Sequence, residues 1–266
     1  MNDFQGMTAL VTGASSGLGA EFARALAAQG SSLILTARRE AQLVALAAEL
    51  RTRHGVHVDV VTADLASVGG PRELCERVAA LDRPVGILVN NAGFGIHGDF
   101  ADVPWAREEE MLRLDILAVA ELTKHFLPAM IERRRGYVLL LSSIGGYQPS
   151  PTYASYSAAK AYVLNLGEAL NYELRGTGVR VSVLSPGITA TEFLATAGQK
   201  ASLYQRMMMM QPGPVVASGL RALRRGRPSI VPGLLNALTV WSVRLMPRRL
   251  QAAVASALMK VGSAPA

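Results

Sequence analysis

The sequence predicts an α/β fold, with a doubly wound parallel sheet of about seven strands and helices on both faces. Short apolar runs alternate with longer segments of helical composition along most of the 266 residues, a pattern typical of parallel strands joined by right-handed crossovers. The apolar runs are uninterrupted rather than alternating, as expected for strands covered by helices on both faces. No linker or repeat interrupts the pattern, so we expect residues 1–266 to form one domain.

The expected elements follow in order along the chain. Strands are expected at Thr8–Val11, Leu33–Ala37, Val56–Thr62, Ile87–Val89, Tyr137–Leu141, Val179–Leu184 and, as a short last strand, Ser229–Val231. Helices are expected at Ala20–Gln29, Glu40–Arg53, Pro71–Leu81, Trp105–Met130 and Tyr153–Leu174. Pro71 suits a first helical turn, and Pro128 is expected to bend or end the fourth helix.

Composition excludes several classes of protein. Half of the residues are apolar, which is enough for a sizeable core. The single cysteine, Cys75, rules out a disulfide framework, and nothing resembles a metal site. The N-terminus does not read as a secretory signal, and no stretch offers about 18 uninterrupted apolar residues. We therefore expect a cytoplasmic protein.

The formal charge of +7 comes largely from arginines near the C-terminus. Such a charge is compatible with a phosphate-bearing or acidic partner, with an anionic membrane surface, or with solvated side chains, the reading that we favour. The basic residues are not interleaved with stacking aromatics, so we expect no nucleic-acid binding.

A glycine cluster separates the first strand from the first helix. Gly13, Gly17 and Gly19 surround Ser15, Ser16 and Leu18 in the segment TGASSGLG. The absence of side chains lets a pyrophosphate approach the backbone, and the helix N-terminus presents free N–H groups to it. Turn glycines are the alternative, but the strand before and the helix after favour a Rossmann-type dinucleotide site.

The end of the second strand indicates which dinucleotide is bound. An acidic residue there would favour NAD(H), whereas this chain has Arg38 and Arg39. A guanidinium can pair with a 2′-phosphate through two hydrogen bonds, so we favour NADP(H); the alternative is that both arginines are solvated loop charges. Asp64, followed by Leu65, could accept from an adenine amino group or cap a turn.

These residues, with the later motifs, resemble the short-chain dehydrogenase/reductase family. The matching pieces are TGASSGLG at 12–19, AR at 37–38, DL at 64–65, NNAG at 90–93, Ser143, YSAAK at 156–160 and PGITAT at 186–191. The match covers about residues 6–195, in the order and spacing usual for the family.

The resemblance implies an NADP(H)-dependent carbonyl reductase or alcohol dehydrogenase. Ser143 would polarise the substrate oxygen, Tyr156 would act as general acid or base, and Lys160, one helical turn later, would contact the nicotinamide ribose and lower the tyrosine pKa. The other residues implied to contact the cofactor are Asn91, Ala92, Gly93, Pro186, Gly187, Ile188 and Thr191.

One position departs from the family pattern. Where the family usually has an asparagine that holds a water linked to the lysine, this chain has Asp115. A carboxylate can accept from that water or pair with Lys160, and we expect Asp115 to complete the relay. The alternative is a helix residue that bonds to local backbone.

Substrate choice in the family depends on three segments, which here carry Phe94, Ile96, Tyr147, Phe193, Leu194 and Met207–Met210. Their apolar character predicts an apolar ketone or aldehyde, although the methionines could equally pack into the core. Residues 188–214 are expected to form a substrate loop or lid. His97 has no evident partner and receives no role.

An apolar extension covers residues 232–266 and is broken by Arg244 and by Pro247, Arg248 and Arg249. A subunit contact, a lid and an interfacial membrane patch are all compatible with it, and we favour subunit contact. The long helices predict a homodimer or homotetramer. The alternative to an enzyme is a redox sensor that binds the cofactor without turnover, which only Asp115 supports.

Overall fold

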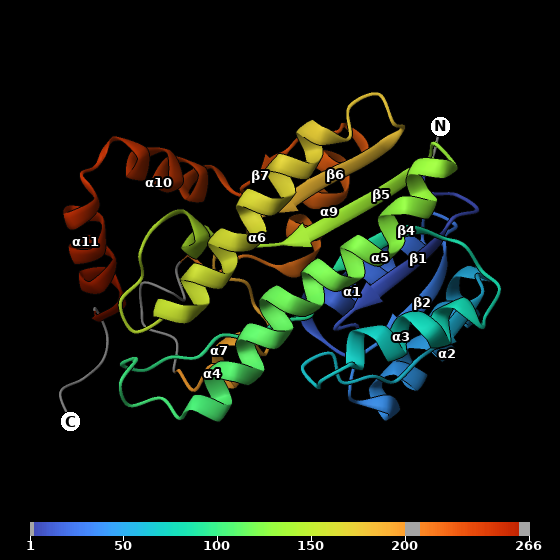
Figure 1. Ribbon diagram of the computed structural model, residues 1–266, viewed down its shortest axis with the longest axis horizontal. Coiled ribbons are helices and arrows are strands. Elements are labelled where there is room, and N and C mark those ends of the chain that lie inside the picture. The colour runs from blue at the N-terminus through green and yellow to red at the C-terminus, as the bar shows by residue number, and fades with distance from the viewer. Residues whose placement is uncertain (1–2, 200–207, 261–266) are drawn as a thin grey trace.

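The computed structural model describes residues 3–199 and 208–260, and these form a seven-stranded parallel sheet with the strand order β3-β2-β1-β4-β5-β6-β7 (Figure 1). The strands are β1 (Thr8–Thr12), β2 (Ser32–Thr36), β3 (Val58–Val60), β4 (Val85–Asn90), β5 (Gly136–Leu141), β6 (Val179–Leu184) and β7 (Ser229–Ile230). The order reverses between β1 and β4, which is where open α/β sheets bind ligands at the carboxyl ends of their strands. The predicted fold class is confirmed.

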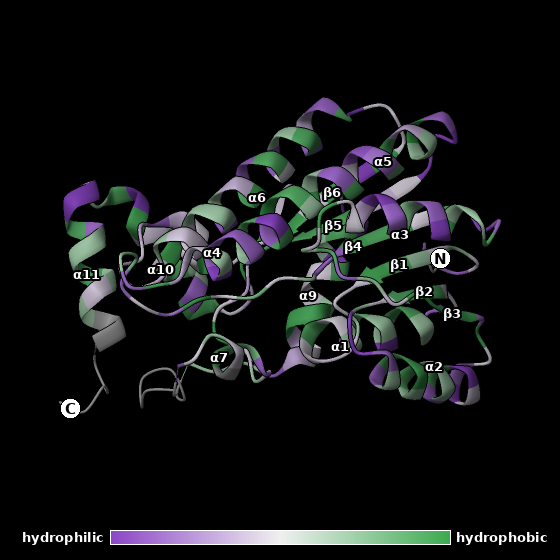
Figure 2. Cartoon of the chain, turned by 60° about the horizontal axis from the view of Figure 1, so that its bottom comes forward, coloured by the Kyte–Doolittle hydropathy of each residue, from purple (hydrophilic) through white to green (hydrophobic). Residues whose placement is uncertain are grey.

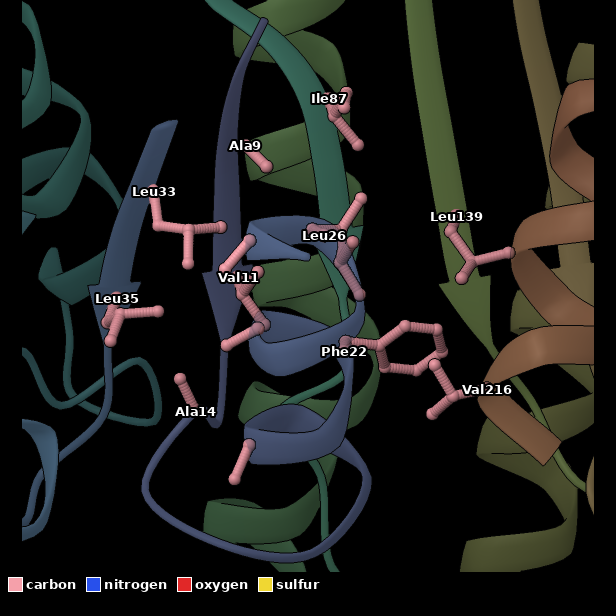
Figure 3. Packing of buried hydrophobic residues seen from close by; sticks show 14 of the residues in the cluster. Ala9, Val11, Ala14, Phe22, Leu26, Leu33, Leu35, Ile87, Leu139 and Val216 are labelled. Atoms are coloured by element: carbon pink, nitrogen blue, oxygen red, sulfur yellow. The ribbon is translucent and has the colours of Figure 1, made fainter. Parts of the chain in front are cut away.

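Helices cover both faces of the sheet (Figure 2). One face carries α1 (Gly17–Ala27), α2 (Glu40–His54) and α9 (Pro212–Arg224), and the other carries α3 (Gly70–Ala79), α5 (Val119–Glu132) and α6 (Ala154–Glu173). Each face has its own apolar core. Figure 3 shows Phe22 and Leu26 of α1 packed between the sheet and Val216 of α9. Both strand faces are buried, which explains the uninterrupted apolar runs.

The predicted helix over Trp105–Met130 is three segments. An α-helical start, α4 (Trp105–Leu112), leads into a π-helical turn, η1 (Arg113–Ala118), and then into α5. Pro128 lies inside α5, and the helix continues to Glu132, so the expected end at Pro128 is wrong. The irregularity lies at η1 instead, and π-turns of this kind frequently mark functional sites.

Two helices follow β7 and stand at one end of the molecule (Figure 1). They are α10 (Leu234–Leu245) and α11 (Arg248–Lys260), and they are separated at Met246 and Pro247. Gln251 of α11 donates hydrogen bonds to the carbonyl oxygens of Val243 and Met246, both at 2.8 Å, and so fixes the angle between the helices. In the described part of the chain, no helix has both the length and the apolar character needed to cross a bilayer.

Candidate active site

The carboxyl ends of β1, β4, β5 and β6 surround a cavity of about 520 Å³. At one end lies the glycine-rich loop after β1, and at the other lie Ser143, Tyr156 and Lys160. The predicted residues Ser15, Ser16, Leu18, Leu65, Ala92, Gly93, Pro186, Gly187, Ile188 and Thr191 also line it. Residues from across the sequence are therefore brought to one site because parallel strands end at the same edge of the sheet.

The glycine-rich loop has the shape of a phosphate cradle. Gly13 and Gly17 have φ angles of +66° and +54°, which favour glycine. A Cβ on Gly19 would lie 2.1 Å from the Gly13 carbonyl oxygen, so α1 packs against the loop too closely for any side chain there. Gly17 opens α1, whose N-terminal N–H groups are free of intrahelical partners. These features fit a dinucleotide pyrophosphate.

Hydrogen bonds join the end of β1 to the end of β4 below the glycine-rich loop. The amides of Asn91 and Ala92 both donate to Thr12 Oγ1 at 2.9 Å, and the Asn91 side chain donates to the Thr12 carbonyl oxygen at 2.9 Å. Asn91 thus supports the central sheet. Thr12 was not among the predicted site residues, although it is the first residue of the glycine motif.

The two arginines after β2 occupy different places. Arg38 pairs with Glu110 at 2.9 Å, whereas Arg39 donates to Ser15 Oγ at 3.2 Å and to Ser16 Oγ at 2.6 Å. Arg39 also pairs with Glu192 at 3.0 Å. Both guanidinium groups line the cavity, but Arg39 is the one hydrogen-bonded to the glycine-rich loop.

Asp64 lies at the same end of the cavity, at the turn that follows β3. Its Oδ1 accepts from the Ala66 amide at 3.0 Å. The carboxylate therefore caps the turn that the sequence offered as one alternative, and it also lines the cavity.

Ser143 and Tyr156 form the hydroxyl pair at the other end. Ser143 follows β5, and its Oγ accepts from the Gly145 amide at 3.1 Å, which fixes its position at the start of a short 3-10 turn. Burial raises the pKa of the Tyr156 phenol, the Asp115 carboxylate raises it further, and the hydrogen bond with Ser143 lowers it. The net result is a raised pKa of Tyr156. The resemblance implies the opposite, namely that Lys160 lowers the pKa of the tyrosine.

After burial, the second cause of the raised Tyr156 pKa is the Asp115 carboxylate, which forms a buried ion pair with Lys160. Lys160 Nζ lies 2.8 Å from Asp115 Oδ2 and donates to the Leu141 carbonyl oxygen at 3.2 Å. The exposed fractions of the two side chains are 6% and 0%. Burial raises the pKa of Asp115, and Lys160 and the Phe94 amide act against that shift. The carboxylate offsets the charge of the ammonium, which lies 5.6 Å from the centroid of the Tyr156 ring.

The π-helical turn η1 carries Asp115. Its Oδ1 accepts from the Phe94 amide at 3.1 Å, directly after the NNAG segment. A Cβ on Gly93 would lie 2.9 Å from Asp115 Oδ1 and 3.1 Å from Lys160 Nζ, so the glycine is needed for the pair to fit beneath the loop. Asp115 therefore contacts the Phe94 amide and Lys160, which are distant in sequence. These contacts exclude the alternative that it bonds only to local backbone.

The end of the cavity around Tyr156 carries aromatic side chains. Phe193 of α7 (Phe193–Thr196) lies at a tilt against Tyr156, with ring centroids 5.3 Å apart, and Tyr153 meets Tyr156 edge-on, with centroids 6.0 Å apart. The predicted substrate segment is anchored by a bridge in which the Ala190 amide donates to the Met210 carbonyl oxygen at 2.9 Å. Residues 200–207, including Met207, lie outside the described residues.

The extension after residue 232 also contributes to the wall. Asn236 and Thr239 of α10 and Ala255 of α11 line the cavity. Asn236 lies against Gly187, where a Cβ would approach its Nδ2 to 2.5 Å. Sequence reasoning did not place these residues in the site, because nothing in the pattern indicates the angle at which two helices return to the sheet.

Known proteins with this arrangement are numerous. The family profile described as short chain dehydrogenase matches residues 7–202. An uncharacterised oxidoreductase of Myxococcus xanthus is 38% identical over 192 residues, covering 71% of this chain and 74% of its own.

Solved structures agree over more of the chain. A short-chain dehydrogenase from Sphingobium yanoikuyae in complex with NADPH has 32% identity and a TM-score of 0.80, covering 90% of this chain and 94% of that one. A 7beta-hydroxysteroid dehydrogenase has 27% identity and a TM-score of 0.86, covering 96% and 98%. The chain thus belongs to the short-chain dehydrogenase/reductase family of oxidoreductases.

Proposed function

We propose that the protein is an NADP(H)-dependent reductase of bulky apolar ketones or aldehydes, in which Tyr156 exchanges the proton with the substrate oxygen. The observation that carries the proposal is that the Tyr156 phenol and the Ser143 hydroxyl line the same cavity as the glycine-rich loop. The proposal agrees with the oxidoreductase activity of the family to which the chain belongs.

The cofactor would lie along the strand ends. Its pyrophosphate fits the loop of Gly13, Gly17 and Gly19, and its nicotinamide end would meet the backbone at Ile188 and the hydroxyl of Thr191. When bound, the nicotinamide supplies the hydride that reaches the carbonyl carbon.

The side chains of this chain handle the oxygen and the proton. The Ser143 hydroxyl donates a hydrogen bond to the carbonyl oxygen and polarises it, and the Tyr156 phenol gives that oxygen its proton as the alcohol forms. A phenolate remains on Tyr156. The Lys160 ammonium stabilises this phenolate. Asp115, whose carboxylate lies 2.8 Å from the ammonium, holds Lys160 in place. The carboxylate would also accept from the water of the relay through which the proton of Tyr156 is replaced.

The preference for NADP(H) rests on Arg39 as well as on the predicted Arg38. Because Arg39 donates to both Ser15 and Ser16, its guanidinium is held beside the phosphate loop. The guanidinium can exchange its ion pair with Glu192, an exposed carboxylate, for a contact with a 2′-phosphate. The exchange costs little free energy, because exposed ion pairs contribute little. The solved relative from Sphingobium yanoikuyae in complex with NADPH is consistent with this choice.

The substrate class follows from the apolar wall around Tyr156. Phe193, Tyr153 and Phe94 surround the space next to the phenol, and aromatic walls of this kind favour a bulky apolar body with one polar group. A hydroxysteroid dehydrogenase among the solved relatives acts within the same fold, which supports a multi-ring or branched ketone as the first substrate to test.

The test is NADPH oxidation with a panel of ketones and aldehydes that increase in bulk, for the wild type and for Tyr156→Phe. We expect turnover that rises with bulk, and a loss of roughly 10²- to 10⁴-fold in kcat for the variant because its proton donor is gone. NADPH binding by the variant, measured by fluorescence, should remain. Binding without turnover across the whole panel by the wild type would instead favour the redox-sensor alternative.

A further inference from the structure

The outer faces of α10 and α11 are apolar. On α10, Leu234, Leu238, Trp241 and Leu245 recur at helical spacing and are 76%, 52%, 60% and 71% exposed. The opposite face, with Asn236, Val240 and Val243, is buried against the protein. Leu250 and Val254 continue the exposed apolar surface on α11, while Gln251 and Ala255 face inward. The helical hairpin formed by α10 and α11 thus has one face that packs against the rest of the fold and a second, apolar face that is exposed.

Three exposed arginines lie where α10 meets α11, next to this second face. Arg244 lies near the end of α10, and Arg248 and Arg249 open α11. At 100° per residue, Arg244 is displaced by about 100° from the middle of the stripe of Leu234, Leu238 and Leu245, so it lies at the edge of the apolar surface rather than within it. An apolar stripe bordered by arginine is the pattern of a helix that lies in a membrane interface.

The charge of the chain is divided unevenly in the same direction. Glu192 is the last acidic residue, and residues 193–266 contain ten lysines and arginines, so this part carries +10 while residues 1–192 carry −3. No carboxylate of the C-terminal quarter can neutralise Arg244, Arg248 or Arg249, and a partner that covers them must supply negative charge. Asymmetry of this kind points to an anionic surface.

A second copy of the chain fits this face less well. A two-fold contact would place the hairpin of one copy on the hairpin of the other, and the three arginines would then oppose three arginines. The long helices offer another place for subunit contact, since Leu117, Tyr162 and Tyr172 are exposed there. Anionic phospholipid satisfies both requirements of the hairpin, because acyl chains take the apolar stripe and headgroups take the arginines.

We infer that α10 and α11 form an interfacial hairpin by which the protein docks on anionic lipid surfaces. The inner sides of the same helices line the cavity through Asn236, Thr239 and Ala255. A docked hairpin therefore brings the cavity next to the bilayer, where apolar carbonyl compounds concentrate. This last consequence rests on the proposed function, whereas the docking itself does not.

The experiment uses Trp241 as its own reporter. Trp105→Phe leaves Trp241 as the one tryptophan of the chain, and this variant is mixed with vesicles of phosphatidylcholine containing roughly 30% phosphatidylglycerol, an anionic content meant to give a negative surface potential. We expect the emission to move to shorter wavelength and the protein to sediment with the vesicles. Trp241→Phe, which keeps Trp105, is the matched control and should bind without a wavelength shift.

Charge and apolar area are tested separately. Each arginine near an anionic surface contributes about fivefold, so the triple variant R244Q/R248Q/R249Q should bind roughly a hundredfold more weakly, and added salt should weaken the wild type in the same sense. Leu238→Ser with Trp241→Ser should reduce binding by more than about tenfold. NADPH binding, which does not depend on these exposed side chains, reports whether each variant is folded.

Two results would overturn the inference. The first is that the folded, NADPH-binding protein does not bind anionic vesicles at low salt. The second is a fall in the oligomer mass of Leu238→Ser/Trp241→Ser by light scattering, which would assign the face to a second copy. An unchanged mass together with lost vesicle binding supports docking, even if no ketone is ever found to be reduced.

Discussion

Asp115→Asn removes one buried charge from the site while keeping the shape of the side chain. Lys160 Nζ lies 2.8 Å from the carboxylate and 5.6 Å from the centroid of the Tyr156 ring, so the carboxylate is no more than about 8.4 Å from that centroid. At an effective dielectric constant of about 20, a unit charge about 8 Å away changes the ionisation free energy of the phenol by about 2 kcal/mol, or roughly 1.5 pKa units. This figure sets the scale of the effect.

The sign follows from the contacts. Asp115 raises the pKa of Tyr156, so its loss lowers that pKa, and Lys160, no longer neutralised, acts in the same direction. Alcohol oxidation needs the phenolate and therefore rises with pH through the tyrosine pKa, whereas carbonyl reduction needs the phenol and falls with pH through it. In Asp115→Asn both limbs should move to lower pH by roughly one unit.

The assay is the pH profile of kcat/KM in both directions, with NADP⁺ and alcohol or NADPH and ketone. Glu108→Gln is the matched control, since it removes a buried carboxylate from α4 that does not line the cavity, and its profile should coincide with that of the wild type. If the Asp115→Asn profile coincides with the wild type as well, or moves to higher pH, the reasoning about the ion pair is wrong.

Three further substitutions test other parts of the site. Arg39→Ala should raise KM for NADPH on the order of tenfold with little change for NADH, because a charge-assisted hydrogen bond is lost; an equal effect on both cofactors would refute the 2′-phosphate contact. Gly19→Ala should weaken NADPH binding more than about tenfold and cost about 1–3 kcal/mol in unfolding free energy, since its Cβ would lie 2.1 Å from the Gly13 carbonyl oxygen, whereas Gly213→Ala, with 3.4 Å to the nearest side-chain atom, should be tolerated. Phe193→Ala should raise KM for bulky ketones about tenfold and leave small ketones unaffected; a uniform change would place the ring outside the substrate space.

The strands and the motifs at their ends could be predicted because both depend on local signals. A buried parallel strand is an uninterrupted apolar run, and β6 begins and ends where the sequence predicts. The glycines, Ser143, Tyr156 and Lys160 then converge because parallel strands share one carboxyl edge.

The π-turn was not predicted, because Trp105–Met130 has helical composition throughout and no residue type marks the turn that holds one extra residue. Pro128 was the visible signal for an end of the helix, but α5 continues to Glu132. The ion pair of Asp115 and Lys160 depends on that turn, so the sequence could offer the contact only as one alternative.

The different roles of Arg38 and Arg39 were also hidden. The two residues are adjacent, and which guanidinium faces the glycine-rich loop depends on the backbone direction after β2. Likewise, the apolar stretch after residue 232 gave no sign of which face of each helix turns inward, because both faces of α10 are apolar.

The most direct test of the account is isotope transfer. The wild type is given NADPH that carries deuterium at the transferable position of the nicotinamide, together with a bulky ketone, and the alcohol product is analysed by mass spectrometry. We predict that the deuterium reaches the carbonyl carbon, and that Tyr156→Phe forms this product more slowly by roughly 10²- to 10⁴-fold. Bound NADPH that yields no labelled alcohol from any ketone or aldehyde of the panel would contradict the account.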